Sequence, residues 1–257
     1  MLPGALFSIG PFSVHMYGVM IAIGLLACFL VLWYYSKKKN IDPSFVDFVF
    51  YDGIAAIILG FGGGMLFQAF YNYLEHPENG FRFGSGMTFI GGLIAGAAVF
   101  LIGYFAFRKK LKGRLVDILS ILPCCILVAH GFGRIGCFFA GCCYGLETDS
   151  FLGVKFPGLP NPVHPTQLYE AAFLFIMFGI CSYLVLKKDF QYNLPLYLAS
   201  YGVFRFLIEF LRGDDRGAFV GVLSPSQFWS IGMILMAVAV YFGLRYFLGK
   251  RKEELKK

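Results

Sequence analysis

An arginine, a glutamate and a second arginine share one apolar stretch of this sequence. Arg205 and Glu209 stand four residues apart, and Arg212 follows three later, in YGVFRFLIEFLRGD. Residues at these spacings lie on one face of a helix, which Tyr201 extends, so these side chains can pair. A charge at bilayer depth costs about 2.5–3.5 kcal/mol on insertion scales. Each charge therefore needs a partner or a ligand, and the fork of a guanidinium suits a phosphate group.

A structural interpretation of the same residues also stands. Arg205 and Glu209 can serve only to hold helices together, while Arg212 reaches to the membrane interface. Arg134, however, lies in a second apolar stretch, AHGFGRIGCFFAGC, one helical turn after His130. The glycines there predict close helix packing, which does not account for an arginine among them. We therefore expect a site for an anionic lipid headgroup.

The segment HPTQLYE, from His164 to Glu170, opens another apolar stretch. Thr166 can cap the helix that begins here, although Tyr169 stands where a capping box has its acidic residue. His164 and Glu170 can also act as proton-transfer groups at the membrane face. The segment supports both interpretations.

The sequence has seven cysteines, and their positions match neither a secreted disulfide framework nor a CxxC…CxxC zinc pattern. Three of them, Cys137, Cys142 and Cys143, lie close together in the sequence. Small packing residues, a disulfide or redox role, and metal binding are the three interpretations of this group. Because the three follow one another at one helix end without spaced partners, we expect no metal there.

The elements that position these residues must be membrane-spanning helices. The chain has 58% hydrophobic and 14% charged residues, whereas a soluble domain has roughly 25% charged. About 20 apolar residues cross a bilayer. Seven stretches qualify: 14–35, 46–74, 87–107, 115–142, 165–186, 194–212 and 226–248. We expect an all-α polytopic protein, with a single membrane domain over 1–257 and a capping or re-entrant loop at 143–164.

The positive charges predict the orientation of the chain. Sixteen of its 22 Lys and Arg residues lie at 37–39, 108–114, 187–188, 245 and 250–257. With seven spans and an outside N-terminus, all of these segments face the cytoplasm, as the positive-inside rule requires. The net charge of +7 thus indicates orientation in the bilayer and no nucleic-acid partner. The C-terminus is expected in the cytoplasm.

Taken in order, the motifs resemble the prolipoprotein diacylglyceryl transferase family of bacterial inner-membrane enzymes. The resemblance covers nearly the whole chain. Its motifs are VHMYG at 14–18, FYN at 70–72, MTFIGGLI at 87–94, GRIG at 133–136, HPTQLYE at 164–170, YG at 201–202, RF at 205–206 and EF at 209–210.

The resemblance implies transfer of a diacylglyceryl group from phosphatidylglycerol to the lipobox cysteine of a preprolipoprotein, with release of glycerol phosphate. It implies that Arg134 and Arg205 hold the phosphate and that Glu209 pairs with and orients them. It implies no metal and no cofactor. The residues that line the substrate pocket are expected to be Tyr17, Tyr201, Arg212, His164, Gln167 and Glu170.

Four positions depart from the family pattern. Ile90 stands where the family usually has histidine, Gly64 where it has arginine, and Cys137 and Cys142 where it has asparagine and an acidic residue. The base is therefore expected to be His130, unless the field of the arginines alone activates the thiol. A paralogue with another lipid acceptor, and a non-enzymatic transporter or lipid-binding protein, are the alternative functions.

Overall fold

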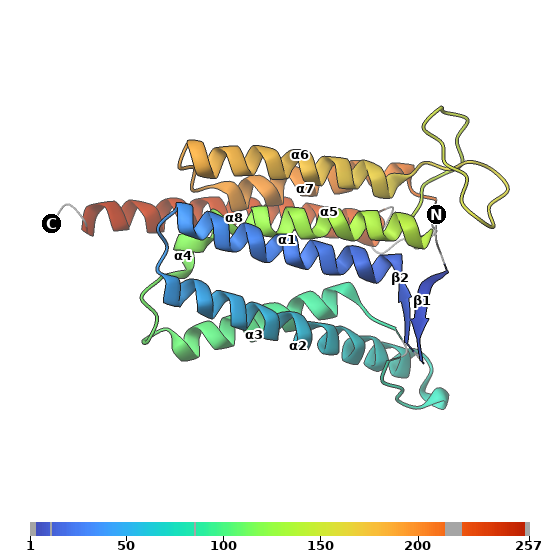
Figure 1. Ribbon diagram of the computed structural model, residues 1–257, viewed down its shortest axis with the longest axis horizontal. Coiled ribbons are helices and arrows are strands. Elements are labelled where there is room, and N and C mark those ends of the chain that lie inside the picture. Colours follow the sequence, from blue (N-terminus) through green and yellow to red (C-terminus); the bar gives the residue numbers. More distant parts are fainter. Residues whose placement is uncertain (1–3, 11, 85, 214–222, 255–257) are drawn as a thin grey trace. The chain divides into compact units, whose positions relative to one another are not determined.

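Helices dominate the computed structural model, which describes residues 4–10, 12–84, 86–213 and 223–254 (Figure 1). Its α-helices are α1 (Met16–Lys38), α2 (Pro43–Glu75), α3 (Phe89–Phe107), α4 (Leu115–Ile118), α5 (Leu122–Ala140), α6 (Thr166–Lys187), α7 (Asn193–Ile208) and α8 (Pro225–Glu254). Its short elements are the strands β1 (Ala5–Ile9) and β2 (Phe12–His15) and the 3-10 turns η1 (Pro77–Asn79) and η2 (Glu209–Leu211).

In the described part of the chain, six helices are long and apolar enough to cross a membrane. They are α1, α2, α5, α6, α7 with its continuation η2, and α8, while α3 contributes a shorter apolar stretch, Gly91–Phe107. The 23 residues of α1, at 1.5 Å each, extend about 35 Å, which exceeds the hydrocarbon thickness of a bilayer. The predicted class, an all-α polytopic membrane protein, is confirmed. The seventh span and the orientation stay predictions.

Two local features differ from the sequence-based expectation. The N-terminal residues form an antiparallel hairpin, with Ser8 opposite Ser13. The predicted span 115–142 is wrong at its start, because α4 ends at Ile118 and α5 begins only at Leu122. Pro123 explains this beginning, since proline lacks an N–H group and is tolerated only in the first turn of a helix.

The chain divides into two compact units, one of Met1–Lys39 with Leu115–Lys257 and one of Asn40–Arg114. The predicted single domain over 1–257 stays a prediction. In the second unit, α2 packs on α3 through glycines. A Cβ atom on Gly60 would lie 3.0 Å from the carbonyl oxygen of Gly92 and 3.3 Å from the Cα atom of Gly96. Small residues let the two backbones approach, which is how membrane helices commonly associate.

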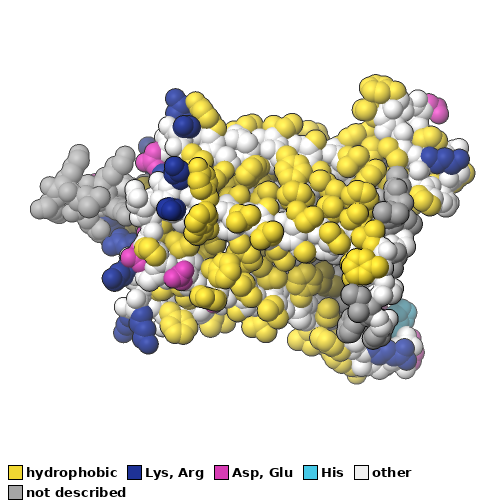
Figure 2. Space-filling model, in the orientation of Figure 1, with side chains coloured by type: hydrophobic (Ala, Val, Ile, Leu, Met, Phe, Trp, Pro, Cys, Tyr) yellow, Lys and Arg dark blue, Asp and Glu magenta, His cyan; other side chains and the backbone are white. Residues whose placement is uncertain are grey.

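The first unit holds α1, α5, α6, α7 and α8. Helix α1 packs on α5, α5 on α6, and α7 on α8. Glycines again set the close approaches, since a Cβ atom on Gly24 would lie 2.9 Å from the carbonyl oxygen of Ala129. Apolar side chains cover the outer sides of the helices (Figure 2), and Trp33 and Leu26 are among the exposed ones. Such surfaces suit contact with lipid chains.

The segment 143–164, expected as a capping or re-entrant loop, connects α5 to α6 and pairs with η2, which follows α7. The Leu146 N–H group donates to the carbonyl oxygen of Leu211 at 2.8 Å. Phe156 anchors the loop, because its side chain is buried and packs edge-on against Phe138 of α5. The loop is thus fixed against the helix ends of its own unit.

Candidate functional site

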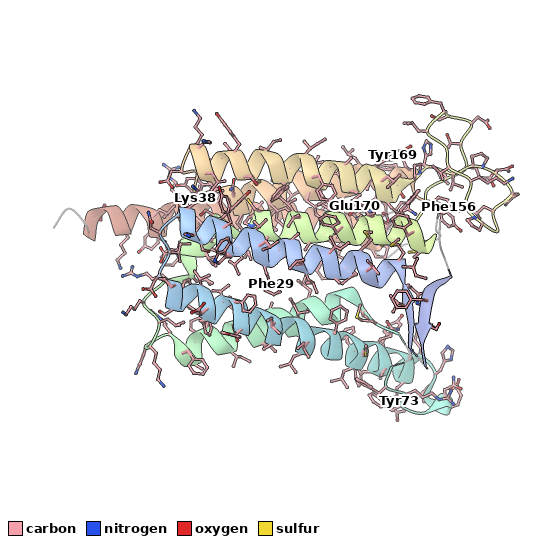
Figure 3. The ribbon with its side chains drawn as sticks, in the orientation of Figure 1. Phe29, Lys38, Tyr73, Phe156, Tyr169 and Glu170 are labelled. Atoms are coloured by element: carbon pink, nitrogen blue, oxygen red, sulfur yellow. The ribbon has the colours of Figure 1, made fainter. Side chains whose placement is uncertain are left out.

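A buried carboxylate, Glu170, lies at the centre of a polar group formed by α5, α6 and α7 in the first unit. Its side chain comes from the first turn and a half of α6 and points toward α5 (Figure 3). Arg134 of α5 places Nε 3.0 Å from Glu170 Oε1. The Tyr201 hydroxyl of α7 donates to the same oxygen at 2.7 Å, and His130 Nε2 lies 3.5 Å from it. Three helices therefore meet at one negative charge.

His130 and Tyr201 also contact each other. Their rings meet edge to face with centroids 5.2 Å apart, and Tyr197, one turn earlier on α7, stacks on Tyr201. These aromatic neighbours hold the imidazole beside Glu170. The predicted residues His130, Arg134, Glu170 and Tyr201 are thus brought together by the fold.

A second carboxylate, Glu209, holds the arginines at the end of α7. Arg205 Nη1 lies 2.7 Å from Glu209 Oε2, which confirms the predicted i, i+4 pair. Arg212 Nε lies 4.0 Å from the same oxygen. The Ser224 hydroxyl donates to Glu209 Oε1 at 2.8 Å, and Arg205 Nη2 donates to the Ser226 hydroxyl at 2.7 Å. Both arginines are buried, so this cluster removes two positive charges from water at the start of α8.

The expected role of Glu209 needs a correction. The resemblance implied that this one carboxylate orients the arginines, but its ion pairs are with Arg205 and Arg212. The ion-pair partner of Arg134 is Glu170, which comes from a different helix. Sequence spacing could not reveal this pair, because its two residues are not on one helix. The only signal in the sequence was a general rule, that charged residues within membrane-spanning segments pair with one another.

The two arginine clusters lie near one another. Arg205 follows Tyr201 by one turn of α7, and the charges of both Arg134 and Arg205 act on His130. Among the described residues, no hydrogen-bond acceptor is aligned with Arg134 Nε or Arg205 Nη1, although a carboxylate is close to each. Each guanidinium is thus held beside a carboxylate, at 3.0 Å for Arg134 and 2.7 Å for Arg205. The expectation of one cavity open to the outer leaflet stays a prediction.

Three other predicted residues occupy the edge of this group. The Gln167 amide donates to the carbonyl oxygen of Cys142, so its side chain holds the loop after α5. His164 Nδ1 lies 3.2 Å from the Tyr169 hydroxyl. Tyr17 lies in the first turn of α1 and is 44% exposed, and a Cβ atom on Gly136 of α5 would lie 3.1 Å from its ring.

Thr166 does not cap α6, which was one of the two interpretations of this segment. Pro165 stands at the N-cap position, with no side-chain cap hydrogen bond. The Thr166 hydroxyl donates to the carbonyl oxygen of Cys143 at 2.8 Å. The first turn of α6 therefore holds the loop that follows α5, through Thr166 and Gln167, both of which are buried.

Three thiols gather where α5 ends. The Sγ atoms of Cys137, Cys142 and Cys143 all lie within 4.8 Å of one another. Their adjacency along the chain did not predict this convergence. The signal was present in Gly141, because a glycine just past a helix end favours a turn that brings the flanking residues together.

Comparison with known proteins places the chain among a group of membrane transferases. The family that matches residues 4–243 is described as prolipoprotein diacylglyceryl transferase. The chain is 36% identical over 245 residues to the phosphatidylglycerol–prolipoprotein diacylglyceryl transferase of Clostridium tetani, covering 92% of this chain and 95% of that protein. It is 31% identical to the second such enzyme of Clostridium perfringens, covering 89% and 90%. It is 33% identical to that of a Marinomonas species, covering 91% and 89%.

Proposed function

The chain belongs to the prolipoprotein diacylglyceryl transferase family, and on that premise we propose that it transfers a diacylglyceryl group from phosphatidylglycerol to a prolipoprotein. The acceptor is the lipobox cysteine thiol, and glycerol phosphate is released. The names of the relatives support the lipid and the protein substrate. The helices long enough to span a membrane agree with a lipid donor, and the enzyme is a multi-pass protein of the bacterial cell membrane.

The proposal depends above all on two arginines in apolar helices, Arg134 partly buried and Arg205 buried, each held beside a carboxylate. In the reaction, the acceptor sulfur attacks the glyceryl carbon of the lipid, and the carbon–oxygen bond to the phosphate breaks. Negative charge then grows on the phosphate oxygen that leaves. Arg134 and Arg205 are assigned to this phosphate, because preorganised donors stabilise a charge that develops in the transition state.

The carboxylates hold these arginines in place before the lipid binds. Glu170 binds Arg134 and also accepts the Tyr201 hydroxyl hydrogen bond. Glu209 binds Arg205. Both are assigned as positioning residues, since an arginine held in one rotamer loses less entropy when it binds an anion. Arg212, His164, Gln167 and Tyr17 are assigned to the edge of the lipid or acceptor site.

The proton of the acceptor thiol is assigned to His130. A free thiol has a pKa of about 8.5, so attack at neutral pH needs a base or a positive field. His130 lies 3.5 Å from Glu170, and this carboxylate can stabilise the imidazolium once the proton is taken. Glu209 is a poorer candidate, because its carboxylate already binds Arg205.

Replacing His130 by glutamine should therefore change the pH–rate profile of transfer. Wild type should lose activity below the pKa of its histidine, and His130→Gln should lack this acidic limb and be slower at neutral pH. The measurement is the initial transfer rate across pH, with detergent-extracted protein checked for assembly. An unchanged profile would instead leave thiol activation to the field of the arginines.

The transfer itself can be measured with phosphatidylglycerol that is labelled in its acyl chains. The purified protein in mixed micelles should move the label to a peptide with a lipobox cysteine and release one glycerol phosphate per transfer. Mass spectrometry should locate a thioether on the cysteine. A peptide with serine in its place and phosphatidylethanolamine as the lipid are the matched controls. Release of glycerol phosphate without label on the peptide would point to another acceptor. If neither glycerol phosphate nor labelled peptide forms, the proposed activity is refuted.

A further inference from the structure

The end of α5 is built so that two of its cysteines must meet. Gly141 has a φ of 70° in the left-handed region, and its N–H group donates to the carbonyl oxygen of Phe138 at 3.1 Å. The N–H group of Cys142 donates to the carbonyl oxygen of Cys137 at 3.2 Å. These two bonds define a Schellman motif, in which the residue after the glycine packs on the last turn of the helix. Here that contact joins Cys142 to Cys137.

The third cysteine is held by the backbone. Cys143 has a φ of 65°, a conformation that residues with a side chain rarely adopt. Two buried side chains of α6 hold this turn, since Thr166 donates to the carbonyl oxygen of Cys143 and Gln167 to that of Cys142. A strained backbone that is held in this way is often found at functional sites.

The geometry of the three sulfur atoms suits a thiophilic metal ion. They lie within 4.8 Å of one another, and a tetrahedral zinc ion with Zn–S bonds of about 2.3 Å holds its sulfurs about 3.8 Å apart. Small rotations of the three side chains would therefore bring the sulfur atoms to the separations that a zinc ion requires. Cys142 is exposed and the other two are partly buried, so the cluster is accessible from one side. Structural zinc sites have four protein ligands, whereas catalytic sites have three and one open position.

We propose that Cys137, Cys142 and Cys143 bind one Zn²⁺ ion, whose fourth position takes the thiol of the acceptor cysteine. The sequence led us to expect no metal, because the three residues lack the spacing of a zinc motif. In the fold, the turn at Gly141 that ends α5 and the left-handed backbone of Cys143 bring the three thiols together.

This site has a direct use in the reaction and rests on the proposed function. Zinc coordination makes a thiol lose its proton, so the acceptor sulfur binds the ion as a thiolate while its proton passes to the base, assigned above to His130. The thiolate then attacks the glyceryl carbon, and the electron pair of the broken carbon–oxygen bond leaves with glycerol phosphate. The thioether product is a weaker ligand and dissociates from the ion, which is unchanged.

The position of the cluster fits this sequence of steps. Cys137 follows Arg134 by three residues on α5, and the charge of Arg134 acts on both Cys137 and Cys143. Tyr17 lies near all three cysteines and Arg134. The metal-bound sulfur and the phosphate held by arginine would therefore be neighbours, as attack on a carbon next to that phosphate requires.

The first test is metal content. Full-length protein that has been purified in detergent with reductant, stripped with a chelator and then exposed to ZnCl₂ should retain about one Zn²⁺ per chain. Cys137→Ser and Cys143→Ser should lose this zinc, and the matched control Cys28→Ser should keep it. If a variant fails to assemble, wild type alone decides the question through Co²⁺, which absorbs visible light in a tetrahedral thiolate site. Absence of both signals, or a Cys137–Cys142 disulfide in protein isolated without reductant, would overturn the proposal.

The second test separates the metal site from the transferase activity. A lipobox peptide should change the visible spectrum of the Co²⁺ protein, and a peptide with serine for cysteine should not. Transfer should fall at least tenfold on chelation and return with ZnCl₂. Full transfer by protein shown to be free of metal would refute the zinc site, while the proposed transferase activity would stand. Stoichiometric zinc and the peptide response, without transfer from phosphatidylglycerol, would keep the site and refute the proposed reaction.

Discussion

Glu170→Gln should remove most of the transfer activity and also destabilise the protein. The substitution keeps the size of the side chain but takes away the charge that faces Arg134 at 3.0 Å. Removal of one partner from a buried ion pair costs about 3–5 kcal/mol, because the other charge stays buried without compensation. The measurements are the transfer rate from phosphatidylglycerol and the thermal unfolding of the protein in detergent.

Two variants separate the role of this charge from a general effect of substitution. Glu147→Gln changes an exposed loop glutamate and should leave both measurements unaltered. Tyr201→Phe removes only the hydrogen bond to Glu170 and should cost about 1 kcal/mol, with a smaller loss of rate. If Glu170→Gln kept its activity, Arg134 would not depend on this carboxylate and our account of the site would be wrong.

Arg205→Lys should lower kcat by about 10²–10³-fold, the range found when one transition-state donor is lost. The charge is conserved, but one ammonium cannot reproduce a guanidinium that contacts Glu209 with Nη1 and donates to Ser226 with Nη2. Because the phosphate gains charge only as the bond breaks, we expect kcat to fall more than KM rises. Initial rates over a range of phosphatidylglycerol concentrations give both constants.

Arg245→Lys is the matched control, since Arg245 is an exposed arginine of α8 whose replacement should leave kcat unchanged. Thermal unfolding of Arg205→Lys shows whether the α7–α8 contact survives. An assembled Arg205→Lys protein with full kcat would mean that this arginine only joins the helices. That outcome would restore the structural interpretation of the pair.

The membrane class and the local ion pair could be predicted from the sequence because both depend on neighbours along the chain. A run of apolar residues specifies a spanning helix without reference to the rest of the protein. The same holds for Arg205 and Glu209, because the period of the helix places residues four apart on one face. Their 2.7 Å contact follows from that period. The start of α5 also had a local signal in Pro123, which the predicted span overlooked.

The partners of Arg134 and the thiol cluster required the tertiary structure. Arg134 and Glu170 lie on different helices, and only the packing of α5 against α6 and α7 brings the arginine, the glutamate and Tyr201 together. No spacing encodes such a contact. Cys143 reaches the other two thiols because a left-handed backbone, held by side chains from α6, turns it back toward α5. Local periodicity thus determined the helices and one charged face, whereas packing between helices decided which charges and sulfur atoms meet.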